Sequence, residues 1–219
     1  ASYIRLTAAV LAAFGVRARE EADGWFVPGG QVYRSPGRVA AEGDWSAAAF
    51  WLAANAAGSA IAVEGLDGRS PQGDRAIVPA LEAVRVGDAV IDASDIPDLV
   101  PAIAAAAAAL PVRTRIVRAG RLRLKECDRL AALARGLSAM GADARETADG
   151  LEIAGGALHG ARVDGMNDHR VVMALAVAAL SAQGETVIDG AEAVEKSYPR
   201  FWADFTALGG HAHVEQSGQ

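Results

Sequence analysis

Acidic and basic side chains alternate in the stretch RLRLKECDRL, residues 121–130. Apolar residues follow at helical spacing (Leu130, Leu133, Leu137 and Met140), so the pattern predicts a helix that begins near Glu126. The N-terminus of a helix carries a partial positive charge, which disfavours Lys125 and Arg129 there. A bound anion would remove this conflict, because backbone N–H groups and cations would converge on it. The stretch therefore predicts an anion site, although exposed ion pairs in a solvated first turn would also explain the charges.

Charged residues recur at other predicted turns and helix starts, which carry Asp98, Asp168, His169, Arg170, Glu195, Lys196 and Arg200. If these helix starts meet at one end of the domain, four cations would surround two acids. The cations are Lys125, Arg129, Arg170 and Lys196, and the acids are Asp98 and Glu126. Arginine offers forked donors to a carboxylate or phosphate, and a carboxylate among cations stays ionised and can act as a general base. The pattern predicts acid–base chemistry on a substrate that carries phosphate and carboxylate groups. The alternative is that these residues cap helices and join the repeats as ion pairs, and Asp44, Asn167 and Asp168 suit capping best.

Three segments that share one plan would position these residues. Each begins with a capping residue (Asp44, Asp95 or Asn167) and an Ala-rich helix, and continues with a β-branched run (60–65, 114–120 or 185–192). A charged turn and a second helix follow. Asp44 lies 30 positions before Asp74, and Asp98 lies 30 positions before Asp128. This register predicts an α/β fold of repeated βαβα units.

Short strands and turns complete the second repeat, in ADARET, GLEIAG and ALHGARV. The first repeat is shorter and has little room for such a hairpin before Asp95. Residues 1–41 contain one more helix, over 3–15, and strand-like runs at 23–30 and 31–43, and they resemble the end of a further unit.

Composition limits the function. The net charge of −6 argues against a nucleic-acid partner, which favours a broad basic surface. The longest apolar stretch, 99–112, is too short to span a bilayer, so we expect no membrane segment.

The only cysteine, Cys127, permits no internal disulfide, and the chain is expected in the cytoplasm. Cys127 beside cations at a helix start would have a lowered pKa, but no histidine lies near it in sequence to act as a base. His211 and His213 have no further ligands nearby, so we expect a strand end and tail at 209–219 and no metal site.

Seven motifs occur in one order along nearly the whole chain. They are EGDWSAAAFWLAA, QGD, DIPDLVP, RLRLKECDRLAALA, DGLEI, NDHRVVMALAVAAL and EKSYPRFWADFTALGG. LKECDRL followed by NDHR and EKSYP is a highly specific combination. The chain resembles the C-terminal half of the 5-enolpyruvylshikimate-3-phosphate (EPSP) synthase family, the 3-phosphoshikimate 1-carboxyvinyltransferases.

The resemblance implies a fold and a reaction. The family has two similar lobes of βαβαββ units, an inside-out α/β barrel, with helix N-termini facing the cleft between the lobes. Residues 42–219 would form the main lobe, and residues 1–41 would be the C-terminal fragment of the other lobe. The reaction transfers the enolpyruvyl group of phosphoenolpyruvate to the 5-hydroxyl of shikimate 3-phosphate and releases phosphate. It belongs to aromatic amino-acid synthesis and uses no metal or organic cofactor.

The resemblance also implies a role for each site residue. Asp98 matches the group that takes the hydroxyl proton, and Glu126 matches a proton-transfer acid near the phosphoenolpyruvate methylene carbon. The remaining roles are all contacts to substrate anions. Lys125 and Tyr3 match contacts to shikimate 3-phosphate, Arg129 and Arg170 match the clamp on the phosphoenolpyruvate carboxylate, and Lys196 matches a phosphate contact and possible proton donor.

The family has another half before the matched region, which supplies further substrate ligands. We therefore expect the isolated chain to be inactive unless its partner, the N-terminal half, is supplied. Two other interpretations stay open. The first is that the chain is a non-catalytic truncated module. The second is that it belongs to the sister enzyme that acts on UDP-N-acetylglucosamine, although the KECDR and NDHR pair fits the shikimate enzyme better.

Overall fold

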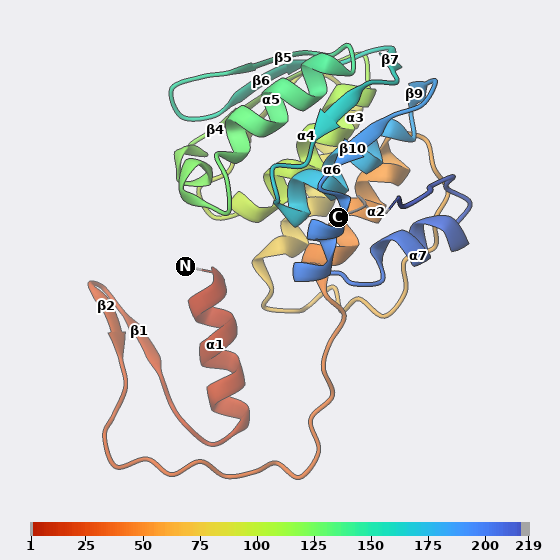
Figure 1. Cartoon of the computed structure of the whole chain (residues 1–219). Coiled ribbons are helices and arrows are strands. Elements are labelled where there is room, and N and C mark those ends of the chain that lie inside the picture. Colours follow the sequence, from red (N-terminus) through yellow and green to blue (C-terminus); the bar gives the residue numbers. More distant parts are fainter. Residues whose placement is uncertain (1, 216–219) are drawn as a thin grey trace.

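The computed structural model describes residues 2–215, which form an N-terminal arm and a larger body (Figure 1). The arm contains helix α1 (Ser2–Ala13) and a hairpin of β1 (Arg19–Glu21) and β2 (Gly24–Phe26). An extended segment then runs to residue 44 and enters the body.

The body alternates helices and strands, as the repeat predicts. Its helices are α2 (Trp45–Ala56), α3 (Ile77–Val86), α4 (Val100–Ala109), α5 (Arg129–Ala139), α6 (His169–Ala179) and α7 (Phe201–Ala207). Its strands are β3 (Ala89–Asp92), β4 (Arg113–Val117), β5 (Asp143–Glu146), β6 (Leu151–Ala154), β7 (Leu158–His159), β8 (Arg162–Asp164), β9 (Ala182–Gln183) and β10 (Val187–Asp189). Short 3-10 helices occupy the turns Gly73–Ala76, Pro97–Leu99, Gly120–Leu124 and Ala191–Lys196.

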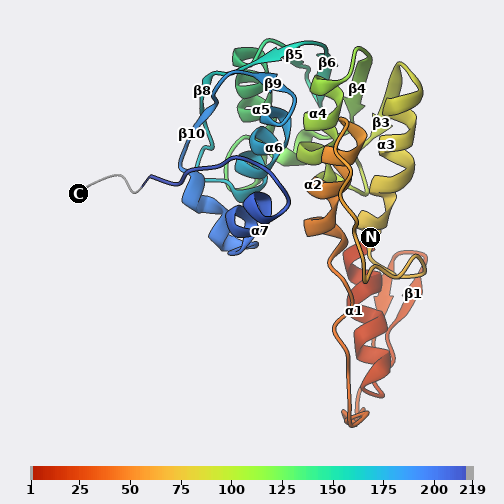
Figure 2. The same cartoon turned by 90° about the vertical axis from the view of Figure 1, so that its right-hand side faces the viewer.

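The main sheet has the strand order β3-β4-β6-β5 and lies on the outside of the body (Figure 2). β3 and β4 are parallel, whereas β6 pairs antiparallel with both β4 and β5. Buried and more exposed residues alternate along β4 and β6, so one sheet face meets the helices and the other meets solvent. Two smaller parallel pairs, β7–β9 and β8–β10, flank the C-terminal repeat.

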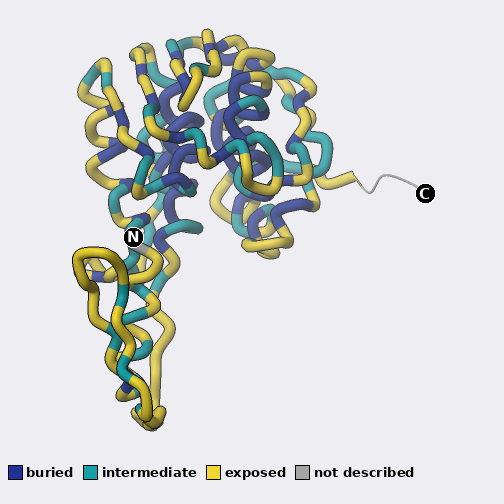
Figure 3. The backbone as a smooth tube through the Cα atoms, turned by 90° about the vertical axis from the view of Figure 1, so that its left-hand side faces the viewer, coloured by how far each residue is buried: buried dark blue, intermediate teal, exposed yellow. Residues whose placement is uncertain are grey.

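The core lies around helices α4 and α6, which contact each other inside the body. Every residue from Val100 to Ala108 is buried, and so is every residue from Val171 to Ala178. A helix that is apolar on all sides must be enclosed, and alanine lets neighbouring backbones approach closely. Figure 3 shows these buried segments in the interior, with exposed residues along the arm. Helices inside and sheets outside agree with the predicted α/β fold class.

Two of the three predicted β-branched runs contain strands, since 114–120 overlaps β4 and 185–192 contains β10. The prediction for 60–65 is wrong, because this segment forms no strand. Its partner in the repeat plan would be a hairpin like β5–β6, which the short first repeat lacks. The side chain of Asn55 instead satisfies both backbone groups of Ile61. It accepts from Ile61 N at 2.7 Å and donates to Ile61 O at 2.8 Å.

Helix α5 begins at Arg129 and not near Glu126, as the periodicity had predicted. Asp128 is its N-cap and accepts from the backbone N–H of Ala131 at 3.1 Å. An ionised aspartate is a favourable cap, so the helix starts directly after it. Lys125 and Glu126 therefore lie in the turn before the helix, and Arg129 is the cation inside its first turn.

The capping predictions are correct for Asp44 and Asp168 and wrong for Asp95 and Asn167. Asp44 caps α2 by accepting from two backbone N–H groups. Asp95 does not cap α4, because the 3-10 helix Pro97–Leu99 precedes that helix directly. Asp168, and not Asn167, caps α6.

The two ends of the chain have less regular structure than predicted. Of the strand-like runs in the arm, 23–30 contains β2, whereas 31–43 forms no strand. Val16 is the one buried residue among 3–43. No strand forms over 209–215, and residues 216–219 lie outside the described part of the chain. Within residues 2–215, no helix has the length and apolar character needed to cross a membrane.

Replacing Ile103 in α4 with alanine tests the proposed core. Ile103 is fully buried, so Ile103→Ala removes apolar contacts and leaves a cavity, which should lower the free energy of unfolding by about 2–5 kcal/mol. Urea unfolding followed by circular dichroism measures the change. Val86→Ala, at the exposed end of α3, is the control and should change stability by less than about 0.5 kcal/mol. Equal losses in the two variants would contradict a core centred on α4.

Candidate functional site

Side chains from distant parts of the chain meet at the carboxylate of Asp98. Oδ1 of Asp98 lies 3.1 Å from Nζ of Lys125 and 2.9 Å from Nη1 of Arg129. The Tyr3 hydroxyl donates to Oδ2 at 2.9 Å. Arg170 donates from Nη1 to the backbone carbonyl of Asp98 at 3.2 Å. The structure thus brings four of the other six predicted site residues into contact with Asp98.

Local structure explains this convergence. Asp98 lies in the 3-10 helix Pro97–Leu99, whose flanking Pro97 and Leu99 are buried and anchor the turn. Arg129 is the first residue of α5, and Arg170 is the second residue of α6. Two capped helix N-termini therefore point at the same turn, as the sequence predicts. Their partial positive charges add to those of the cations.

Arg129 is buried with only 1% of its side chain exposed, and carboxylates occupy its donors. Nε donates to Asp168 at 2.7 Å, Nη1 to Asp98 at 2.9 Å, and Nη2 to Glu126 at 2.7 Å. A buried guanidinium needs such partners, since an unpaired charge in the interior is costly. Each of the three guanidinium nitrogens of Arg129 therefore has a carboxylate partner within the protein.

Lys196 lies beside this cluster and contacts a different residue. Its Nζ donates to the backbone carbonyl of Asn167 and, at 2.8 Å, to the Asn167 side-chain oxygen. Asn167 directly precedes the α6 cap Asp168. Lys196 thus binds the turn that leads into α6, and among residues 2–215 it forms no hydrogen bond or ion pair with Asp98 or Glu126.

Charge fixes the protonation state of Asp98. Burial alone would raise its pKa, but the charges of Arg170 and Lys125 and the hydrogen bonds of Tyr3 and Lys125 outweigh burial and lower the pKa to about 2. Asp98 is therefore ionised at neutral pH and able to accept a proton.

His169 lies next to Glu126 at the edge of the site. Nδ1 of His169 lies 3.7 Å from Oε1 of Glu126 and is a buried atom without a hydrogen-bond partner. Burial and the nearby charge of Arg170 lower the pKa of His169, so the ring is neutral at pH 7. The sequence placed His169 among charged helix starts but assigned it no role.

Asp74 is a member of the site that sequence reasoning did not place there. It is buried and accepts hydrogen bonds from Ser46 Oγ and, at 3.4 Å, from the Tyr3 hydroxyl. Burial raises the pKa of Asp74, in contrast to Asp98. The repeat places Asp74 in the register of Asp128, which caps a helix, so the sequence contained no signal that pointed from Asp74 to the site.

The environment of Cys127 is the opposite of the one expected for a nucleophile. Burial and the charge of Asp168, whose Oδ2 lies 3.7 Å from Sγ, raise the pKa of the thiol to about 12. The expectation of a lowered pKa is therefore wrong, since the neighbouring arginine is already neutralised by acids.

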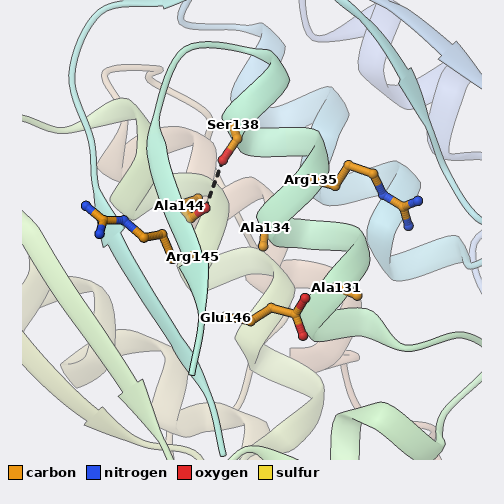
Figure 4. A pocket seen from close by; sticks show the side chains of 7 residues that line it. All are labelled: Ala131, Ala134, Arg135, Ser138, Ala144, Arg145 and Glu146. Carbon is orange, nitrogen blue, oxygen red and sulfur yellow. Dashed lines mark hydrogen bonds between the residues drawn. The ribbon is translucent and has the colours of Figure 1, made fainter. Parts of the chain in front are cut away.

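A surface hollow between α5 and β5 is separate from this cluster (Figure 4). Its lining residues are Ala131, Ala134, Arg135, Ser138, Ala144, Arg145 and Glu146. Ser138 donates to the carbonyl of Ala144 at 2.8 Å across the hollow, which joins the helix to the strand. None of the predicted site residues lines it. The described residues also contain no group of three or more His, Cys, Asp or Glu side chains arranged to hold a metal ion.

The fold matches solved enolpyruvyl transferases. An EPSP synthase from Acinetobacter baumannii superposes with a TM-score of 0.79 at 25% sequence identity, over 94% of this chain and 54% of that chain. The enolpyruvyl transferase NikO from Streptomyces tendae superposes with a TM-score of 0.66 at 18% identity, over 93% of this chain and 52% of that one. The fold is thus that of about half an enolpyruvyl transferase.

Sequence comparison identifies the family within this class. The family profile described as EPSP synthase (3-phosphoshikimate 1-carboxyvinyltransferase) matches residues 1–205. The chain is 42% identical over 228 residues to the 3-phosphoshikimate 1-carboxyvinyltransferase of Methanopyrus kandleri, covering 96% of this chain and 53% of that protein. It is 44% identical over 234 residues to that of Halobacterium salinarum, covering 95% and 54%. The chain belongs to the EPSP synthase family, which confirms the predicted resemblance, and it spans about half the length of these relatives.

Replacing Arg129 tests how much its side chain contributes to the free energy of unfolding. Arg129→Gln leaves the buried carboxylate of Asp168 without its counter-ion, so we expect a loss of about 3–5 kcal/mol in the free energy of unfolding. Thermal and urea unfolding measure it. Arg145→Gln is the matched control, because the pair of Arg145 with Asp143 is exposed and its loss should leave stability unchanged. A neutral effect of Arg129→Gln would show that the buried cluster does not stabilise the fold.

The raised pKa of Cys127 predicts low reactivity. At pH 8 the thiol should be almost entirely protonated, so iodoacetamide should modify the native chain at least tenfold more slowly than the chain unfolded in urea. Mass spectrometry over time gives both rates. A native rate equal to the unfolded rate would mean that the thiol is neither buried nor held protonated.

Proposed function

We propose that this chain forms one half of an active site that transfers the enolpyruvyl group of phosphoenolpyruvate to the 5-hydroxyl of shikimate 3-phosphate and releases phosphate. The observation that carries the proposal is the convergence of Lys125, Arg129 and Arg170 on Asp98. The sequence relatives, which are 3-phosphoshikimate 1-carboxyvinyltransferases, support the same reaction.

Asp98 is the proposed general base. Addition of the hydroxyl to phosphoenolpyruvate requires a group that accepts the hydroxyl proton, and Asp98 is ionised at neutral pH. It is also held by neighbours on both of its oxygens, which orients the carboxylate for the reaction.

Glu126 is the proposed acid that protonates the methylene carbon of phosphoenolpyruvate. The carboxyl group of Glu126, in its protonated form, would deliver a proton to the methylene carbon, which completes the addition and gives a tetrahedral intermediate. Removal of a proton from the new methyl group, with departure of phosphate, then restores the double bond on the product. Glu126 is 38% exposed and lies in the turn before α5, so it can reach a ligand outside the buried cluster.

The cations are the proposed ligands of the substrate anions. Arg129 and Arg170 would bind the phosphoenolpyruvate carboxylate, and that carboxylate would take the places of Glu126 and Asp98 on the outer edge of Arg129. Lys125 and Tyr3 would contact shikimate 3-phosphate. Lys196 would bind the phosphate that leaves, after exchanging its contacts to Asn167. Side chains thus supply the acid, the base and the charge stabilisation, and we assign no cofactor.

The second half of the site would come from an N-terminal half like that of the relatives. We assign residues 1–41 to the second lobe and residues 42–219 to the main lobe. The arm supports this division, since Ile4 and Val10 of α1 are exposed apolar side chains and Val16 is the one buried residue among 3–43. The isolated chain would then be inactive and depend on its partner half. We place the protein in the cytoplasm, in keeping with its single cysteine.

Mixing halves tests the proposal. This chain, added to a separately produced N-terminal half of the Methanopyrus kandleri relative, should release phosphate from phosphoenolpyruvate only when shikimate 3-phosphate is present. Asp98→Asn should abolish most of that activity, because the hydroxyl proton then has no acceptor. Colorimetric phosphate detection measures the rate.

The controls separate the alternatives. Arg145→Gln, remote from the site, should retain full activity in the mixture. Phosphate release with UDP-N-acetylglucosamine in place of shikimate 3-phosphate would favour the sister enzyme. No release by any mixture, together with no binding of either substrate in calorimetry, would favour a non-catalytic module.

A further inference from the structure

Asp168 is a fully buried carboxylate that touches both arginines of the proposed clamp. As the cap of α6, its Oδ1 accepts from the backbone N–H groups of Arg170 at 2.9 Å and Val171 at 3.4 Å. The same carboxylate accepts from Arg129 twice, from Nε at 2.7 Å and from Nη2 at 3.2 Å. One acid therefore joins the start of α6 to the guanidinium that begins α5.

The backbone before Asp168 is in a costly conformation. Met166 and Asn167 both have positive φ, 52° and 51°, in the left-handed region that side chains other than glycine seldom adopt. Lys196 holds this turn through its bonds to Asn167. Such strain persists only where the surroundings enforce it, and here it directs the Asp168 carboxylate into the interior.

The contacts divide the guanidinium of Arg129 into two edges. The inner edge, Nε with Nη2, lies against the buried Asp168. The outer donors face Asp98 and Glu126, whose side chains are partly exposed. A ligand that displaces these two partly exposed carboxylates would meet the outer edge, whereas the inner edge is closed by Asp168, which is fully buried.

We propose that Asp168 is a positioning residue that fixes the inner edge of Arg129, so that the outer edge faces the substrate carboxylate. The same residue sets the start of α6 and with it Arg170. This inference rests on the proposed function for the identity of the anion, but the contact it describes is measurable without any substrate.

Two simpler roles make different predictions. If Asp168 only caps α6, Asp168→Asn should leave anion binding unchanged, because an asparagine oxygen caps equally well. If Asp168 acts only through its charge, Asp168→Asn should strengthen anion binding, because the site becomes more positive. If Asp168 positions Arg129, the same variant should weaken anion binding although the site gains positive charge.

The first measurement uses the wild-type chain and no ligand. In ¹⁵N NMR spectra of the 219-residue chain, the Nε–H of Arg129 should exchange with water far more slowly than that of an exposed arginine such as Arg145. It should lose this protection in Asp168→Asn. Free exchange in the wild type, or retained protection in the variant, would overturn the inference.

The second measurement is a titration with phosphoenolpyruvate, followed by the same NMR signals. We expect Asp168→Asn to weaken binding at least tenfold. Asp128→Asn is the matched control, because it removes the charge from the cap of α5, keeps a capping oxygen and has no recorded contact with the Arg129 side chain. It should bind as the wild type does or slightly more tightly.

Equal or tighter binding by Asp168→Asn would overturn the positioning role. A wild-type chain that binds no phosphoenolpyruvate would count against the proposed function, while the exchange of the Arg129 Nε–H would still decide the role of Asp168. If Asp168→Asn fails to fold, Asp168→Glu takes its place: it keeps the charge but moves the carboxylate, so it should also weaken phosphoenolpyruvate binding, and unchanged binding would overturn the inference.

Discussion

The enclosure of Arg129 among three carboxylates is the constraint on which the site depends. A guanidinium removed from water must find charged partners, and these come from three separate stretches: Asp98, Glu126 and Asp168. Each of those stretches must therefore be held at hydrogen-bond distance from the start of α5. The positions of the 3-10 helix at Asp98 and of the α6 N-terminus are part of the same requirement.

The fold meets this requirement by placing its helices inside and its sheets outside. Alanine-rich α4 and α6 pack closely in the core, where α4 contacts β4 and β6 of the four-stranded sheet and α6 contacts β7, β9 and β10 of the two small sheets. Helices that lie next to one another in this way can bring their capped N-termini to one end of the body. Partial positive charges and cationic side chains then accumulate where Asp98, Glu126 and Asp168 balance them.

The balance of charge also explains how these cations can lie close together in the absence of a ligand. The carboxylates of Asp98 and Glu126 occupy the outer donors of Arg129, so the substrate carboxylate of the proposed function would replace one carboxylate by another. The arm contributes through Tyr3, which bridges Asp98 and the buried Asp74. The site thus includes a residue from the exposed arm as well as from the body.

The sequence alone determined the local features of this protein. Helical spacing predicted the helices, the motifs identified the family, and the charged residue types near helix starts predicted an anion site with acids inside it. These features depend on neighbours within a few residues or on short motifs, so they are readable before folding. Even so, the strength of the Asp128 cap moved the start of α5 by three residues from the position that periodicity favoured.

Only the tertiary structure decided which charges meet. Arg129 and Asp168 are 39 positions apart, and Tyr3 and Asp98 are 95 apart, so no local rule pairs them. The structure placed Lys196 on Asn167, added Asp74 to the site, raised the pKa of Cys127 and left 60–65 without a strand partner. The physical reason is the same in each case: burial and long-range hydrogen bonding exist only once the helices and sheets have packed.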